Sequence, residues 1–277
     1  MKIGYTEFSF GFAFTENLIR SRRTAPDGAP YFPNLIQEAR LGFDVRLEFN
    51  GLPVFYQFKL PELMVRQNAR ELGDQRLVQG GLTLPFFRMP IMKTSISDQH
   101  NILVRLEGQG LGSVQYASPN FQSIDQFNTA FSGCRVHADS ILISPVSIGQ
   151  IDDGEQHHYV YNSGAATGWF CSEPVKVPYL TGSESVDKLI GEVSEKKGIP
   201  VPDIPSKALD AIREVLPRAE RSKVGSIFEI QLREAQESVG SVDLVRDTRE
   251  ELARLIAARN VSRVMLGTEM LLIQAAN

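Results

Sequence analysis

Hydrophobic and polar residues alternate along two neighbouring segments, residues 42–49 and 52–60. Such alternation is typical of a β-strand with one buried face. The Asn50-Gly51 pair that separates the segments is the strongest short signal for a two-residue hairpin with a type I′ turn. The two segments are therefore predicted to form one antiparallel hairpin.

The turn also predicts the register of this hairpin. With Asn50-Gly51 as the loop, Asp44 is expected directly opposite Gln57, and cross-strand partners share a face of the sheet. Lys59 lies two residues after Gln57 and joins it on that face. The alternate positions are predicted to point to the other face, and these are Val54, Tyr56, Phe58 and Leu60.

A helix is predicted over residues 5–21, where apolar residues recur at helical spacing. Phe8 and Phe12, with Leu18 and Ile19 at neighbouring positions, are expected to be buried against a sheet. This aromatic stripe is interpreted as core in preference to a platform for stacking bases.

Two further helices carry capping signals. Ser97 is predicted to cap a helix that ends near Gly108, with Ile102, Leu103 and Leu106 as its buried stripe. Residues 123–133 form the second, with Ser123 and Gln126 in capping-box spacing and Gly133 as the stop.

The apolar segment at residues 84–92 is expected to be a strand at a sheet edge or a short piece, because Pro85 and Pro90 cannot donate to a ladder. Residues 113–119 are predicted to be a core strand. Alternating patterns typical of strands then follow in residues 134–145, 157–162 and 168–177.

From about Thr181 the sequence becomes charged and helix-periodic. We therefore expect an α/β (α+β) protein with two parts: a domain over residues 1–180 with a β-rich extension, and a mainly helical region over residues 181–277. Helices with mixed charge and apolar stripes also suit oligomerisation or partner binding.

Composition narrows the class of protein. The 277 residues are 42% hydrophobic and carry a formal net charge of −4, which argues against a protein that coats nucleic acid by charge alone. No run of residues is apolar enough to span a membrane, and Glu7 interrupts what would be the apolar part of a signal peptide. A cytoplasmic location is expected. Cys134 and Cys171 form neither a disulfide framework nor a CxxC zinc motif.

The predicted hairpin brings a carboxylate, an amide oxygen and an ammonium together, from Asp44, Gln57 and Lys59. Carboxylate and amide oxygens can hold Mg²⁺ or Mn²⁺, and an adjacent lysine can orient or activate the water that attacks a phosphodiester. Taken together, these residues suggest hydrolysis of nucleic acid.

Asp44 followed by Gln57-Phe58-Lys59 on consecutive strands resembles the restriction-endonuclease-like PD-(D/E)XK superfamily, in its variant with glutamine for the second acid. The resemblance covers roughly residues 1–125. It implies a mixed central sheet flanked by helices and a helical glutamate before the hairpin, either Glu16 or Glu38 in a short helical turn. The chain departs from the motif at Phe43, where proline is expected, and at Gln57.

The resemblance implies a Mg²⁺-dependent endonuclease in which Asp44, Gln57, Glu38 and Glu16 are the candidate metal ligands, with Asp44, Gln57, Lys59 and Glu38 catalytic. DNA is a more natural substrate than RNA under this interpretation. By analogy such nucleases often serve antiviral defence against foreign DNA, as homo-oligomers or beside a partner ATPase. The alternative is an inactive nuclease-like module that binds a partner within a larger complex.

Two other polar groups are weighed as sites. His100 and Gln99 stand in the first turn of a helix, where His100 is a structural or capping residue or, alternatively, a catalytic one. Residues 151–158 concentrate acids and histidines that could hold a second metal, although Asp-Asp-Gly is also a good turn. His157 and His158 are adjacent on a predicted strand, so at most one could join the acids.

Overall fold

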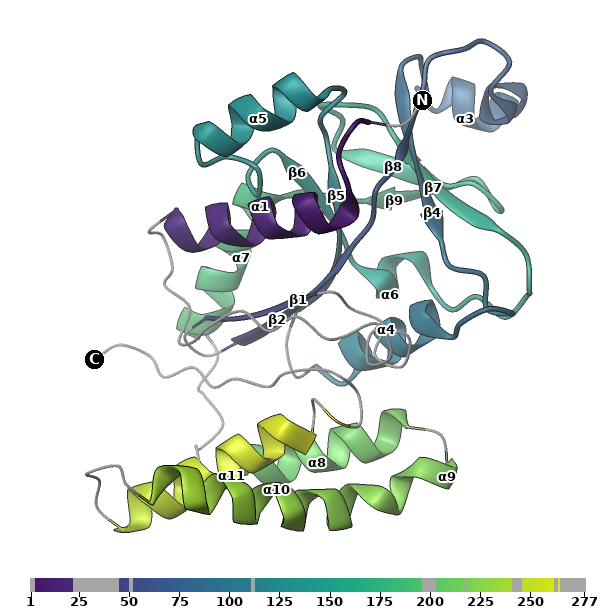
Figure 1. Ribbon diagram of the computed structural model, residues 1–277. Coiled ribbons are helices and arrows are strands. Elements are labelled where there is room, and N and C mark those ends of the chain that lie inside the picture. Colours follow the sequence, from purple (N-terminus) through teal and green to yellow (C-terminus); the bar gives the residue numbers. More distant parts are fainter. Residues whose placement is uncertain are drawn as a thin grey trace.

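The computed structural model describes residues 3–21, 45–49, 52–110, 113–195, 203–216, 218–240, 246–261 and 264. These residues form a mixed α/β structure with two five-stranded sheets, flanking helices and a helical group near the C-terminus (Figure 1). The strands are β1 (Val45–Phe49), β2 (Leu52–Phe58), β3 (Glu62–Met64), β4 (Phe86–Ile91), β5 (Ser113–Pro119), β6 (Ser140–Ile143), β7 (His157–Tyr161), β8 (Thr167–Phe170), β9 (Val175–Pro178) and β10 (Leu180–Thr181). The helices are α1 (Glu7–Arg20), η1 (Arg70–Gly73), α3 (Gln75–Gln79), α4 (Gln99–Gly108), α5 (Ile124–Ser132), α6 (Pro145–Ile148), α7 (Gly182–Glu195), α8 (Ile204–Val215), α9 (Arg218–Arg221), α10 (Lys223–Val239) and α11 (Arg246–Val261).

The first sheet has the strand order β1-β2-β5-β6-β10 and is mixed. β1 and β2 form the predicted antiparallel hairpin, in which Phe49 pairs with Leu52 and Val45 pairs with Tyr56. The predicted register is thus confirmed as far as Val45. β5 then pairs with β2 in parallel, and Gln57 lies beside Tyr116.

The second sheet has the order β3-β4-β7-β8-β9, and each pair in it is antiparallel. The strand expected within residues 84–92 is confirmed as β4, a piece of six residues, but the alternative that it lies at a sheet edge was wrong, because β4 lies between β3 and β7. Pro90 nevertheless has a neighbouring strand on one side only. β3 pairs with residues 86–88 of β4, so Pro90 lies beyond the end of β3 and pairs only with His158 of β7.

Helix α1 packs on the first sheet with Leu18 buried and Ile19 partly buried, as predicted, but the predicted phenylalanines are not the buried ones. Phe10 and Phe14 are buried against Phe58, whereas Phe8 and Phe12 are 76% and 52% exposed. The helix carries phenylalanine at two sets of positions four residues apart, so helical spacing alone cannot decide which set is buried. Gly11 favours the observed face, since a Cβ there would lie 2.7 Å from the ring of Phe58.

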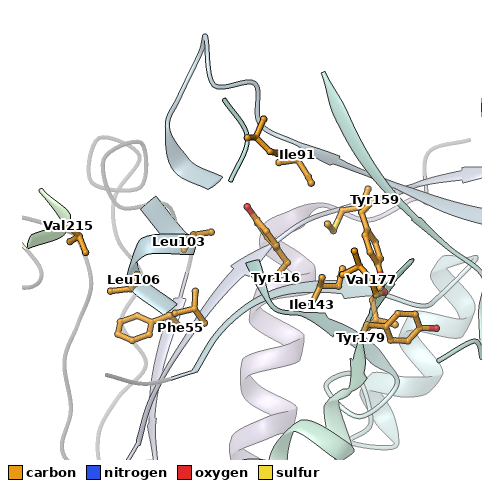
Figure 2. Packing of buried hydrophobic residues seen from close by; sticks show 14 of the residues in the cluster. Phe55, Ile91, Leu103, Leu106, Tyr116, Ile143, Tyr159, Val177, Tyr179 and Val215 are labelled. Atoms are coloured by element: carbon orange, nitrogen blue, oxygen red, sulfur yellow. Dashed lines mark hydrogen bonds between the residues drawn. The ribbon is translucent and has the colours of Figure 1, made fainter. Parts of the chain in front are cut away.

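The largest core lies on the other face of the first sheet and joins it to the second sheet and to α4. Figure 2 shows Phe55 and Tyr116 from the first sheet near Leu103 of α4, and Tyr159 and Val177 of the second sheet packed into the same cluster. A buried hydrogen bond also links the sheets, between the hydroxyls of Ser118 and Tyr161 at 2.9 Å. The two sheets therefore share one apolar interior.

The C-terminal helices α8, α10 and α11 pack on one another and reach the same core through α8, which contacts α4. Val215 lies in this cluster in Figure 2. Helix α7 instead packs on β6 and β10. The division near residue 180 remains a prediction, and its two parts share apolar contacts. In the described part of the chain, no helix is long and apolar enough to cross a membrane.

Candidate functional site

Strand β2 carries Gln57 and Lys59 to the face of the first sheet that α4 covers. Alternation along the strand sends Tyr56 and Phe58 to the opposite face, where they pack with α1, as predicted. Lys59 follows the last residue of β2, yet its main chain remains fastened to β5. Its N–H donates to the Ala117 carbonyl at 3.0 Å, and its carbonyl accepts from the Ser118 hydroxyl at 3.0 Å.

The side chains of Gln57, Gln99 and Lys59 form a buried chain of hydrogen bonds. Lys59 Nζ donates to Gln99 Oε1 at 2.9 Å, and Gln99 Nε2 donates to Gln57 Oε1 at 3.0 Å. An ammonium can only donate hydrogen bonds, so Lys59 bonds to the side-chain oxygen of Gln99. The NH₂ group of the Gln99 amide then points toward Gln57. The exposed fractions of Gln57, Gln99 and Lys59 are 1%, 6% and 9%. Gln99 therefore links the side chains of Gln57 and Lys59.

The first turn of α4 holds Gln99 in place. The N–H of Gln99 donates to the Ser97 hydroxyl at 3.3 Å, but the N-cap of α4 is Asp98, one residue after the predicted cap. Two residues on, the Asn101 amide makes two hydrogen bonds to the main chain of Ile151, at 2.8 and 3.0 Å. Asp98, the N-cap, pairs with Arg105 at 2.8 Å. The beginning of this helix is thus anchored to the segment before β7.

His100 serves the packing of α4 and is fully buried. Its Nδ1 is 2.8 Å from the Tyr116 hydroxyl and its Nε2 is 2.7 Å from the Gly149 carbonyl. Because a carbonyl only accepts, Nε2 carries the proton and Nδ1 accepts from Tyr116. Burial lowers the pKa of His100 below its ordinary value. These contacts favour the structural interpretation of His100 over the catalytic one.

Of the three acidic residues predicted for the site, only Glu16 is among the described residues. Asp44 and Glu38 lie outside the described residues, as does Phe43. The last described pair of the β1–β2 ladder is Val45 with Tyr56, and the predicted pairing of Asp44 with Gln57 would be the next one.

Glu16 is described, and the structure does not bring it to Gln57 and Lys59. Its carboxylate accepts from Arg20 at 3.0 Å and from the Asn17 amide at 2.6 Å. It belongs to α1, which packs on the opposite face of the sheet from Gln99. Of the two glutamates considered for the helical position, Glu38 thus stays as a prediction, while Glu16 is engaged elsewhere.

Among the described residues, the charged side chain of Lys59 has a neutral partner. Its ammonium bonds to the neutral amide of Gln99, and among the described residues no carboxylate forms an ion pair with it. A cation removed from water is costly unless an anion or several acceptors replace the solvent. Within the described residues, the side-chain acceptor of this ammonium is therefore the amide oxygen of Gln99.

The second metal site considered at residues 151–158 does not form in the described part of the chain, where no three His, Cys, Asp or Glu side chains are grouped as metal ligands. His157 contacts Asp153 at 2.5 Å and the Ser172 hydroxyl, whereas His158 contacts Arg70 at 2.7 Å. As predicted, the two histidines serve different faces. Burial, followed by the charge of Arg70, lowers the pKa of His158 to about 4.

The sequence predicted that Gln57 and Lys59 share a face of the sheet, and it placed Gln99 in the first turn of a helix that could face a phosphate. What it did not reveal is that Gln99 bridges them, because that contact joins residues 40 and 42 positions apart. A polar residue at the start of the helix that follows the lysine strand was the available signal. Comparison of the chain with protein-family models, with curated proteins and with solved structures gives no match.

Proposed function

We propose that this protein is a metal-dependent nuclease that hydrolyses phosphodiester bonds, with DNA the more natural substrate. The observation that carries the proposal is the buried Lys59 ammonium, which is bonded to one neutral amide and has no carboxylate partner among the described residues. A phosphate oxygen of the substrate would accept a charge-assisted hydrogen bond from this ammonium.

The order of elements also supports the proposal. A helix, an antiparallel hairpin, a second helix and a strand parallel to the hairpin's second strand follow one another as α1, β1–β2, α4 and β5. The resemblance to the PD-(D/E)XK superfamily implies this same order. The intervening β3 and β4 belong to the second sheet and leave the pairing of β2 with β5 undisturbed.

The chemistry of the donors is compatible with Mg²⁺ or Mn²⁺. Gln57 contributes an amide oxygen, which accepts from Gln99 Nε2 at 3.0 Å, and amide oxygens are among the ligands that these ions use. One amide oxygen is not a metal site by itself, so the proposal assigns the carboxylate ligands to Asp44 and Glu38. When bound, the ion would polarise the phosphate and lower the pKa of a water molecule.

The roles of the chain's own residues follow from the observed contacts. Lys59 would hold a phosphate oxygen and stabilise the negative charge that develops during hydrolysis. Gln99 is a positioning residue, because it orients the ammonium of Lys59 and the amide of Gln57 at the same time.

The test is cleavage of plasmid, linear and single-stranded DNA and of structured RNA by the full chain, with Mg²⁺ or Mn²⁺. The active-site variants are Asp44→Ala and Lys59→Ala, and Lys207→Ala is the matched control, because Lys207 is exposed on α8. Cleavage by the wild type and the control, with loss in both active-site variants at unchanged folding, is the expected result.

Cleavage that persists in Lys59→Ala would contradict the assignment of this site. A folded wild type that cleaves no substrate would favour the second interpretation, an inactive module. Residues 181–277 would then be the first part to test for a partner, including a partner ATPase or another defence protein.

A further inference from the structure

Asp153, His157 and Ser172 form a connected set of polar side chains at one end of the second sheet, outside the residues assigned to the nuclease site. His157 Nε2 is 2.5 Å from Asp153 Oδ1, and His157 Nδ1 contacts the Ser172 hydroxyl. A carboxylate, an imidazole and a hydroxyl linked in this order are the parts of a nucleophilic serine. The three side chains therefore contain the groups that activate a hydroxyl.

The pairing of β7 with β8 brings His157 and Ser172 together. One step beyond the last pair of these strands, the Cys171 N–H donates to the His158 carbonyl at 3.0 Å. The next step in the same direction places Ser172 opposite His157, and cross-strand partners share a face of the sheet. The ring of Phe170 stacks on the imidazole of His157, with 5.2 Å between the ring centroids. The sheet thus fixes the imidazole beside the serine.

Asp153 is also held in place by its neighbours. Its Oδ1 accepts from the Glu155 N–H at 3.0 Å, and its main-chain carbonyl accepts from the Thr94 hydroxyl. The bond to His157 lowers the pKa of the Asp153 carboxyl, so this group is an ionised carboxylate at neutral pH. A carboxylate only accepts hydrogen bonds, so the neutral imidazole of His157 carries its proton on Nε2.

This tautomer leaves Nδ1 of His157 with a lone pair that accepts from the Ser172 hydroxyl. In the Ser-His-Asp triad of serine proteases, Nε2 faces the serine and Nδ1 faces the carboxylate, so the two nitrogens have exchanged their roles here. The chemistry is the same, because either nitrogen of an imidazole can accept a proton while the other one carries its own. His157 is therefore placed as a general base for Ser172.

Burial shields the base and leaves the hydroxyl accessible. The His157 side chain is 5% exposed, whereas Ser172 is exposed in the turn between β8 and β9. Phe170 and Val175 pair across the base of this turn, and Val175 is 51% exposed. Cross-strand partners share a face, so these two side chains offer an apolar surface beside the turn. A small apolar acyl group could contact this surface while its carbonyl carbon meets Ser172.

We propose that Ser172 is an activated nucleophile that takes up the acyl group of a small ester, with His157 as its general base and Asp153 as the positioning residue. Ser172 Oγ forms a bond to the acyl carbon, and its proton passes to His157 Nδ1. The bond from that carbon to the leaving oxygen then breaks, and the leaving oxygen takes the proton from Nδ1. Water releases the carboxylic acid from the serine by the same two steps. This activity does not depend on the nuclease function proposed above.

The first test is labelling of the full chain with a fluorophosphonate reagent, in buffer with EDTA so that metal-dependent hydrolysis does not contribute. Intact-mass spectrometry counts the groups that are added, and peptide mapping locates them. The wild type is expected to take up a single group, on Ser172. Ser172→Ala should lose the label. Ser163→Ala is the matched control and should retain it, because Ser163 is exposed in the turn at the other end of β8.

Two further variants test the imidazole and the carboxylate. His157→Gln should slow the labelling of Ser172 by about 10²-fold, a usual contribution of a general base. Asp153→Asn should lower kcat for hydrolysis of p-nitrophenyl acetate by at least about tenfold at unchanged KM, because Asp153 orients the base and does not contact the ester. Asp152→Asn is its control, since Asp152 is exposed in the same turn. The Asp153 side chain is 58% exposed, so this variant serves as the test if His157→Gln does not fold.

A wild type that takes up no label would overturn the proposal, as would a label of undiminished rate on the Ser172→Ala protein. Equal kcat values for the wild type and Asp153→Asn would also overturn it, because Ser172 would then react without help from the carboxylate. The outcome is separable from the nuclease test, which requires Mg²⁺ or Mn²⁺ and depends on other residues.

Discussion

Two polar clusters, one on each sheet, differ in the partners of their positively charged side chains. In the second sheet, Arg88 contacts the carboxylates of Glu62 and Glu71 at 2.5 and 3.3 Å, and Arg70 also reaches Glu71 at 3.3 Å. Each of these cations has a carboxylate partner. In the first sheet, the side-chain partner of Lys59 within the described residues is the neutral amide of Gln99.

The difference separates a structural cluster from a candidate binding site. Where charges are matched internally, removal of one partner leaves the other buried and unpaired, so the cost falls on folding. Where a cation lacks an internal anion, its removal costs the fold little and deprives a ligand of its contact. The predictions below test this contrast, from the largest expected effect to the smallest.

The largest effect is expected from Lys59→Met on cleavage. Loss of the ammonium should reduce the cleavage rate by about 10²–10³-fold, the usual cost of removing one group that stabilises developing charge. The free energy of unfolding should change by no more than about 1 kcal/mol, because relief from a buried, poorly paired charge offsets the lost bond to Gln99. Cleavage kinetics and denaturant unfolding of the same sample measure both quantities.

Arg88→Met should show the opposite profile. It leaves the buried Glu71 carboxylate without its Arg88 partner, and the loss in free energy of unfolding should be about 3 kcal/mol. Arg76→Ala is the control, because Arg76 pairs with Asp74 on the surface, and its unfolding should match the wild type. Equal stabilities of the two variants would remove the distinction between the clusters.

Gln99→Glu should give Lys59 a carboxylate partner, like the arginines of the cluster on the second sheet. A carboxylate beside Lys59 would match its charge and compete with a substrate phosphate, so the cleavage rate should fall by about tenfold while stability is maintained. Gln109→Glu, exposed after the end of the same helix, is the control. A variant with undiminished cleavage would show that the charge of Lys59 is not used for phosphate.

The smallest effect concerns pH and His158, which contacts Arg70 of the cluster on the second sheet. The pKa of His158 in the folded protein is lowered to about 4, whereas its ordinary value is about 6.5. At a pH between these two values the unfolded chain binds a proton on His158 and the folded chain does not. Stability is then fully present above pH 6.5 and falls as the pH decreases from 6.5 toward 4. His158→Asn should flatten this dependence in unfolding experiments at pH 7, 6 and 5, although buried His100 adds a slope of the same sign. A variant with the same pH slope as the wild type would contradict the assignment.

Much of the local structure could be predicted from the sequence. The Asn50-Gly51 turn predicted the pairing of Phe49 with Leu52, and the capping signals located α5, where Ser123 accepts from the Gln126 N–H at 3.2 Å and Gly133 ends the helix. Each of these features depends on residues within a few positions of one another. The mixed α/β class followed from the same patterns.

Features that depend on competition between surfaces could not be predicted in this way. Helix α1 has two phenylalanine faces, and the close approach of Gly11 to Phe58 accompanies burial of Phe10 and Phe14 in place of Phe8 and Phe12. The position of β4 inside the second sheet likewise depends on β7, about seventy residues later in the chain.

For the candidate site, the sequence by itself determined that Gln57 and Lys59 share a face, because side chains alternate along a strand. Only the tertiary structure decided that Gln99 bridges them and that α1 keeps Glu16 on the opposite face. The physical reason is range: turns, caps and alternation act between neighbours in the chain, whereas burial selects among distant surfaces that compete for the same core.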